Sequence, residues 1–232
     1  MKKTVLMLLL LCGARMSAQT IVQQFAAISA GSGDVSDMDL NQPTSDGSVL
    51  IAMPQQLSPG IKVLKVTDNA PDGGNTYKEV TGAASSCASK VIQIFYCENC
   101  KSGVTELKFH LSGAVRASIN GFLEVSNLAQ SAAPDGSGVH VNDGVGTSKG
   151  LEVGPQIVTT ATDFIIGRYS AATKPAGVTP DLWTYKTTYV YGLNLPAGTY
   201  QPTLNGGKAG DNFCMSVAAF KIAAPVPAKP QN

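Results

Sequence analysis

The stretch that decides the fold is Trp183-Thr-Tyr-Lys-Thr-Thr-Tyr-Val-Tyr-Gly-Leu-Asn-Leu-Pro-Ala-Gly-Thr-Tyr200, followed after a glycine-rich bend by Asn212-Phe-Cys-Met-Ser-Val-Ala-Ala-Phe-Lys-Ile222. β-branched and aromatic residues dominate both segments, and such residues suit a pleated, half-buried surface. Pro196 and Gly198 indicate a turn, because proline fixes φ and glycine tolerates a positive φ. The stretch therefore predicts three strands joined by a turn and a bend, which would close an antiparallel β-sandwich.

Strand patterns separated by turn signals recur through the rest of the chain. Residues 104–111 alternate between apolar and polar side chains, as in a strand with one face in water. The pair Asn120-Gly121 stands between two apolar runs and predicts a β-hairpin with a type I′ turn. Residues 129–154 are rich in glycine and read as a long loop. No helical period of useful length appears after residue 18, so we expect an all-β, antiparallel, jelly-roll-like β-sandwich.

Composition narrows the class of protein. The chain has 232 residues, of which 44% are hydrophobic and only 14% charged, with a formal net charge of +1. The hydrophobic share is enough for a core, and a low charge with many glycines fits a loop-rich exported β protein. A nucleic-acid partner is not expected, because such proteins carry a basic footprint.

The first 18 residues have the pattern of a signal peptide. Lys2 and Lys3 precede an apolar run, and Met16-Ser-Ala18 provides small residues for cleavage. The run is too short for a permanent transmembrane helix, and Leu11 before Cys12 disfavours lipid attachment. Cleavage would remove three cations and no acid, lowering the formal charge from +1 to −2. We expect residues 1–18 to be a signal peptide, residues 19–222 one β-sandwich domain, and residues 223–232 a proline-rich disordered tail. The destination after export (periplasm, cell surface or extracellular space) stays open.

Four cysteines remain after such a cleavage: Cys87, Cys97, Cys100 and Cys214. An even number in an exported chain usually forms disulfides, here with three possible pairings. The C-x-x-C spacing also occurs in redox sites and zinc knuckles, but here no helix pattern follows it and no second such motif is present. We prefer Cys97–Cys100 and Cys87–Cys214, because the first pair is local and leaves the other two to join.

A family resemblance rests on strand order and one turn. The predicted strands at 90–96 and 104–111, the hairpin at 115–125, the Leu195-Pro-Ala-Gly-Thr-Tyr200 turn and the final strand resemble galactose-binding-like jelly-roll modules of secreted bacterial proteins. The resemblance covers about 130 residues and implies a carbohydrate- or surface-binding role by analogy. No binding residue of that family has a recognisable counterpart here.

Aromatic residues at 183, 185, 189 and 191 share one face if the segment is a single strand. An exposed face would stack sugars, with Trp183 and Tyr185 as the ligand-binding residues. A buried face would belong to the core, and the leucines at 193 and 195 favour that interpretation. Burial of these rings would therefore remove the sugar platform and put a structural role first.

Other chemistry has weaker support in the sequence. Asp135, Ser137, Asn142 and Asp143 offer oxygen ligands for calcium, but their spacing fits no known calcium loop, and we expect no cofactor and no metal. The two histidines lack a nucleophile in a known motif. Paired carboxylates from distant strands would still permit glycoside hydrolysis.

We expect an exported, non-enzymatic module that binds a glycan or a surface polymer. The alternatives are a structural or adhesive surface protein and, more distantly, a secreted hydrolase. The oligomeric state stays open.

Overall fold

The computed structural model describes residues 18–30, 33–87, 90–142, 150–208, 210 and 212–224, without the side chains of residues 30 and 142. All secondary structure in these ranges is β, and every strand pair is antiparallel, which confirms the all-β prediction. The strands are β1 Thr20–Ala30, β2 Val35–Asp39, β3 Ser48–Gln56, β4 Val63–Asp68, β5 Lys78–Glu79, β6 Ser85–Cys87, β7 Lys90–Ile92, β8 Phe95–Cys97, β9 Glu106–Leu111, β10 Ala117–Ser126, β11 Pro134–Asn142, β12 Leu151–Val153, β13 Ile157–Thr159, β14 Asp163–Ala171, β15 Gly177–Thr179, β16 Thr184–Tyr185, β17 Tyr189–Leu195, β18 Gly198–Tyr200, β19 Thr203–Asn205 and β20 Phe213–Lys221.

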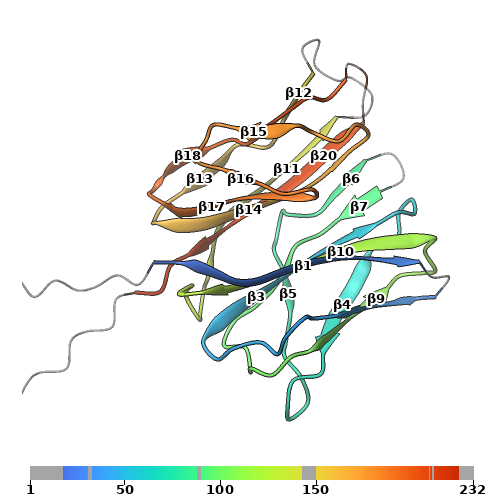
Figure 1. The fold of residues 1–232 in the computed structure, drawn as a ribbon, viewed down its shortest axis with the longest axis vertical. Coiled ribbons are helices and arrows are strands. Elements are labelled where there is room, and N and C mark those ends of the chain that lie inside the picture. Colours follow the sequence, from blue (N-terminus) through green and yellow to red (C-terminus); the bar gives the residue numbers. More distant parts are fainter. Residues whose placement is uncertain are drawn as a thin grey trace, which may run out of the picture.

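The strands described stack in layers (Figure 1). Sheet 1 has the order β1-β10-β3-β7-β6, with β8 and β5 attached beside β3. Sheet 2 has the order β2-β9-β4 and covers one face of sheet 1. Sheet 3 has the order β11-β20-β14-β17-β16 and covers the other face. Two small outer sheets, β12-β19-β15 and β13-β18, cover the far face of sheet 3. The fold is thus a sandwich with more layers than the two that the sequence suggests.

Each layer boundary is filled by its own apolar core. Along β3, Val49 and Ile51 pack between sheets 1 and 3, whereas Leu50 and Ala52 pack between sheets 1 and 2. Successive side chains of a strand point to opposite faces, so a strand with a core on each side must be apolar throughout. This explains why β3 is buried over its whole length. The same holds for β20, whose odd and even positions enter different cores.

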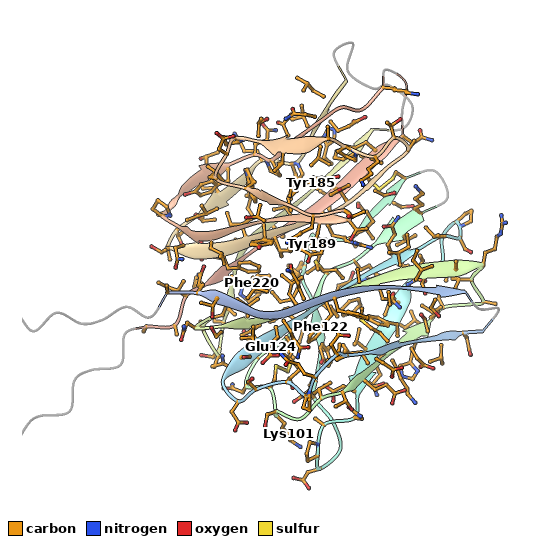
Figure 2. The ribbon with its side chains drawn as sticks, in the orientation of Figure 1. Lys101, Phe122, Glu124, Tyr185, Tyr189 and Phe220 are labelled. Carbon is orange, nitrogen blue, oxygen red and sulfur yellow. A yellow bond between two sulfur atoms is a disulfide. The ribbon has the colours of Figure 1, made fainter. Side chains whose placement is uncertain are left out.

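The boundary between sheets 1 and 3 changes character along β20. Phe220 and Ala218 lie in the apolar core at one end, and Figure 2 shows Phe220 between the two sheets. Ser216 follows, with its hydroxyl 2.9 Å from that of Ser85 in sheet 1. Cys214 then forms a disulfide with Cys87 of β6. One end of this boundary is therefore apolar, and the other is polar and covalently linked.

Both disulfides agree with the expected pairing. Cys87 is joined to Cys214 across 127 residues of sequence, and Cys97 to Cys100 across three. The Cys97–Cys100 pair follows β8 and leads into a bend and not a helix, so it lacks the setting of a redox site.

Two predictions about strands are wrong. Asn120-Gly121 is no turn: β10 runs unbroken through it and pairs on both sides, with β1 and β3. The Asn120 side chain is buried, and its amide donates to the Ser36 hydroxyl at 2.8 Å. Residues 129–154 are not one loop, because they contain β11, the edge strand beside β20.

Most residues at the two ends of the chain are not among those that the structure describes. Apart from Ala18, Ala223 and Ala224, the expected signal peptide and the expected tail lie outside the described residues. Within the part of the chain that the structure describes, no helix is long and apolar enough to cross a membrane.

Candidate functional site

The aromatic residues at 183–191 do not form one stripe. The segment is split between β16 and β17, which pair with each other around a turn at residues 186–188. Tyr189 and Tyr191 enter the core between sheets 1 and 3, whereas Trp183 and Tyr185 enter the core on the opposite face of sheet 3. Trp183 is only 5% exposed and Tyr185 is half-buried. The rings therefore offer no exposed platform for stacking sugars. Of the two alternatives that the sequence left open, the structure supports the core role.

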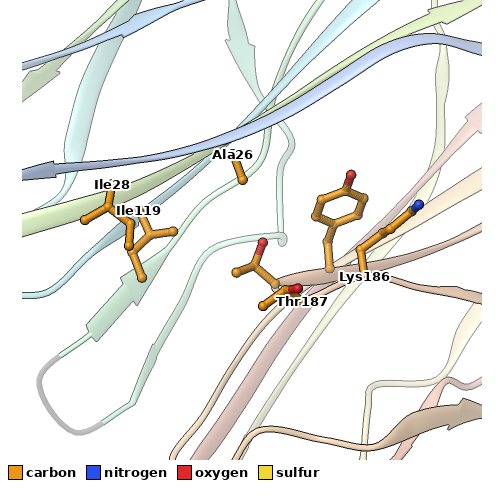
Figure 3. A pocket seen from close by; sticks show the side chains of 7 residues that line it. Ala26, Ile28, Ile119, Lys186 and Thr187 are labelled. Carbon is orange, nitrogen blue, oxygen red and sulfur yellow. The ribbon is translucent and has the colours of Figure 1, made fainter.

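A groove lies instead where sheets 1 and 3 meet at their edges. It has a volume of about 520 Å³, in the range of small-molecule sites. Ala26, Ile28 and Ile119 of sheet 1 line one wall, and residues 186–189 of sheet 3 line the other. Figure 3 shows Ile28 and Ile119 side by side across the groove from Thr187 and Lys186. Ile28 is 74% exposed, the highest value among the large hydrophobic residues of the described chain.

A second hollow of about 270 Å³ adjoins this groove. The two linings share Ile119, Thr187 and Thr188, so they form neighbouring parts of one depression. Lys90 of β7 and Lys174, from the loop after β14, also line the second hollow. We call the two hollows together the intersheet groove: the larger half is mainly apolar, and the smaller half combines apolar side chains with polar ones and two lysines.

The turn that forms one wall of the intersheet groove is held by partly buried hydrogen bonds. The Tyr169 hydroxyl lies 2.8 Å from the carbonyl oxygens of both Lys186 and Thr187. Tyr185 donates its hydroxyl to the carbonyl of Pro175, another residue of the lining, at 2.7 Å. Burial raises the pKa of Tyr169 well above its ordinary value, so its hydroxyl remains a donor. Tyr185 thus supports the groove from behind without lining it.

Arg168 lies beneath the groove and is fully buried. Its guanidinium donates to the carbonyls of Ile119 at 2.8 Å and Thr188 at 3.0 Å, and to Gln55 Oε1 at 3.2 Å. All three acceptors belong to residues that line the groove. None of them is a carboxylate, so they solvate the charge without neutralising it. Burial lowers the pKa of Arg168 to about 10, which leaves it protonated at neutral pH.

A buried carboxyl pair stands apart from the groove, between β11, β14 and β20. Asp135 accepts hydrogen bonds from the amide and hydroxyl of Thr160 at 2.6 and 2.7 Å and lies 3.3 Å from Lys221 Nζ. These partners outweigh the effect of burial and lower the pKa of Asp135 to about 2. Asp163 is fully buried, and among the described residues neither of its carboxyl oxygens has a hydrogen-bond partner. Burial, reinforced by the charge of Asp135, raises the pKa of Asp163 to about 7.

The residues considered for calcium do not assemble a site in the described structure. Asp135 is occupied by Thr160 and Lys221, and the Ser137 hydroxyl donates to the carbonyl of Thr81. The side chain of Asn142 and all of Asp143 lie outside the described residues. Among the residues described, no three His, Cys, Asp or Glu side chains gather as metal ligands.

Sequence reasoning did not find the groove. Ala26 and Ile28 occupy alternate positions of β1, but their exposure follows from β1 being the edge of sheet 1. The three lysines come from segments far apart in the sequence. Only the strand order brings them together, and the sequence carries no local signal of that order.

Comparisons with known proteins do not identify the site. No protein-family model, no curated protein and no solved structure gives a significant match to this chain.

Proposed function

We propose that this chain is an exported, non-enzymatic module that binds a carbohydrate or another surface polymer in the intersheet groove. The observation that carries the proposal is the open groove of about 520 Å³, which combines an exposed Ile28 with the hydroxyls of Thr187 and Thr188. Sugars present both apolar ring faces and hydroxyl groups, and this lining offers partners for each. The resemblance to carbohydrate-binding jelly-roll modules was argued in part from a hairpin at 115–125, where the structure has the single strand β10, so the proposal rests on the groove.

Export is supported by the signal-like residues 1–18 and by the disulfides. Disulfides persist in oxidising compartments outside the cytosol, and the Cys87–Cys214 bond here joins two sheets. The absence of an enzymatic role is proposed from the lining alone: the described residues around both hollows include no carboxylate, imidazole or thiol. Glycoside hydrolysis, the enzymatic alternative considered above, uses a pair of carboxylates beside the bond that is cut.

A structural or adhesive role without a small ligand is the second candidate. The burial of Trp183 favours it, because the ring that would most readily stack a sugar belongs to a core. The groove keeps the binding role first, since it places the exposed Ile28 beside threonine hydroxyls in a hollow of ligand size.

A glycan array tests the proposal directly. Residues 19–232 would be screened together with Ile28→Asp, which places a charge in the apolar half of the groove. The matched control is Leu64→Asp, because Leu64 is 68% exposed on β4 of sheet 2, a layer away from the groove. We expect binding to at least one glycan class, a loss of tenfold or more with Ile28→Asp, and no change with Leu64→Asp. Failure of the unaltered protein to bind any glycan would overturn the binding role and leave the structural one.

A further inference from the structure

All charged side chains among the described residues that line the intersheet groove are positive. Lys186 lines the larger hollow, and Lys90 and Lys174 line the smaller one. They come from three separate segments: the β16–β17 turn, β7 and the loop after β14. No Asp or Glu is found among the described residues of either lining. The ion pairs of the described chain involve other lysines, namely those at 78, 108 and 221.

This concentration of positive charge contrasts with the chain as a whole. Lys and Arg number 17 and Asp and Glu 16, so the protein is close to balanced. Three lysines around one depression, with no acid among the described residues of its lining, therefore depart from the overall charge. Surface charges of one sign that line a hollow raise the local concentration of ligands of the opposite sign.

Arg168 adds a fourth cation that solvent does not reach. Its three acceptors are Gln55, Ile119 and Thr188, so the guanidinium lies directly behind the lining where the two hollows meet. Its Nε has no hydrogen-bond partner in the described structure. An uncompensated buried cation is costly, and an anion in the groove would offset part of that cost.

We propose that the ligand of the intersheet groove is an acidic polysaccharide, with its sugar rings against Ile28 and Ile119 and its anionic groups near Lys90, Lys174 and Lys186. This inference rests on the proposed function and specifies its ligand class. The apolar half accounts for the sugar backbone, and the basic half accounts for the charge. Acidic polysaccharides carry their negative charge on carboxylate or sulfate groups, and either group could lie near the three lysines. A simple polyanion without sugar rings would use only the basic half.

The test compares four probes by calorimetry at low and moderate salt. The probes are an oligogalacturonate, its fully methyl-esterified and therefore neutral form, a sulfated dextran oligomer, and poly-glutamate as a polyanion without sugar rings. The variants are Lys90→Gln, Lys174→Gln and Lys186→Gln, singly and combined. Lys65→Gln is the control, because Lys65 is exposed on β4 of sheet 2. Thermal melts of each variant check that it is folded.

We expect at least one of the two acidic sugars to bind, with an affinity that falls as salt rises. Each of the three lysines should contribute about two- to fivefold, and the triple variant should lose roughly 10- to 100-fold, whereas Lys65→Gln should change nothing. Carboxylated and sulfated probes distinguish the two anionic groups. If the neutral methyl ester bound as tightly as the acidic oligogalacturonate, and Ile28→Asp still weakened that binding, the preference for an acidic ligand would be overturned. The proposed function would then stand. Tighter binding of poly-glutamate than of both acidic sugars would refute a polysaccharide ligand. Failure of all four probes would also refute this inference, and the glycan array then decides separately on the proposed function.

Discussion

Replacing Asp163 by asparagine should remove a pH dependence built into sheet 3. The substitution keeps the shape of the side chain and prevents it from ionising. Asp163 is fully buried, and its pKa is raised from 3.8 to about 7 by burial and by the nearby charge of Asp135. A raised carboxyl pKa means that the folded protein binds the proton more tightly than the unfolded chain does. The resulting stability is complete below about pH 4 and is lost as the pH rises through about 7.

The magnitude follows from the shift. About three pKa units at about 1.4 kcal/mol each give an upper value of about 4 kcal/mol for the cost of ionising Asp163 in the fold. Part of this loss has already occurred at pH 4.5, so the wild type should lose up to about 3 kcal/mol relative to Asp163→Asn between pH 4.5 and pH 8. Asp135 does not confound this window, because its pKa is lowered to about 2 and its contribution is lost only as the pH falls further.

Urea unfolding at several pH values, with the disulfides intact, measures the difference. The matched control is Asp181→Asn, since Asp181 is an exposed acid. Its stability should follow that of the wild type across the range. If Asp163→Asn and the wild type gave parallel stability curves from pH 4.5 to 8, the reasoning about a buried, protonated carboxyl would be refuted.

Three further predictions concern stability and are checked by urea or thermal unfolding. Replacing both Cys87 and Cys214 by alanine opens a loop with a sequence separation of 127 and should cost roughly 3–5 kcal/mol on the chain-entropy model; an unchanged urea midpoint would contradict this. Phe122→Ala leaves a cavity between sheets 1 and 2 and should cost about 3–5 kcal/mol, with Phe122→Leu as the milder control; equal losses from both would argue against a packing role. Gly154→Ala would place a methyl 2.8 Å from the carbonyl oxygen of Pro202 and should cost about 1–3 kcal/mol, and a wild-type melting temperature would show that the backbone yields there.

The fold class could be predicted from the sequence because strand periodicity is local. The pattern of 104–111 was read correctly: β9 Glu106–Leu111 alternates, with Leu107 and Phe109 buried. The turn predicted at Asn120-Gly121 was wrong because turn propensity is also a local property. Strand β10 instead runs straight through these residues, since it pairs with β1 on one edge and β3 on the other. Tertiary pairing overrode the turn signal, and Asn120 found a buried partner in Ser36.

The candidate site could not be predicted in the same way. Alternation along residues 183–191 assumes one strand, but the turn at 186–188 reverses the chain and places the rings on opposite faces of sheet 3. The groove itself depends on which strand forms the edge of sheet 1. A sequence reports which residues prefer burial, but it does not report the strand order that leaves Ile28 exposed.

The position of β20 has a consequence for synthesis. This strand comes last in the sequence, yet it lies between β11 and β14 in sheet 3 and contributes to the cores on both faces. A ribosome completes every strand of sheets 1 and 2 by Ser126, but sheet 3 lacks the interior strand β20 until Lys221 has been made. A product truncated before Phe213 would keep β11 and β14 with unpaired edges and would remove Ala218 and Phe220 from the core between sheets 1 and 3. Such edges and apolar faces promote aggregation, so this protein should depend on quality control that removes incomplete chains.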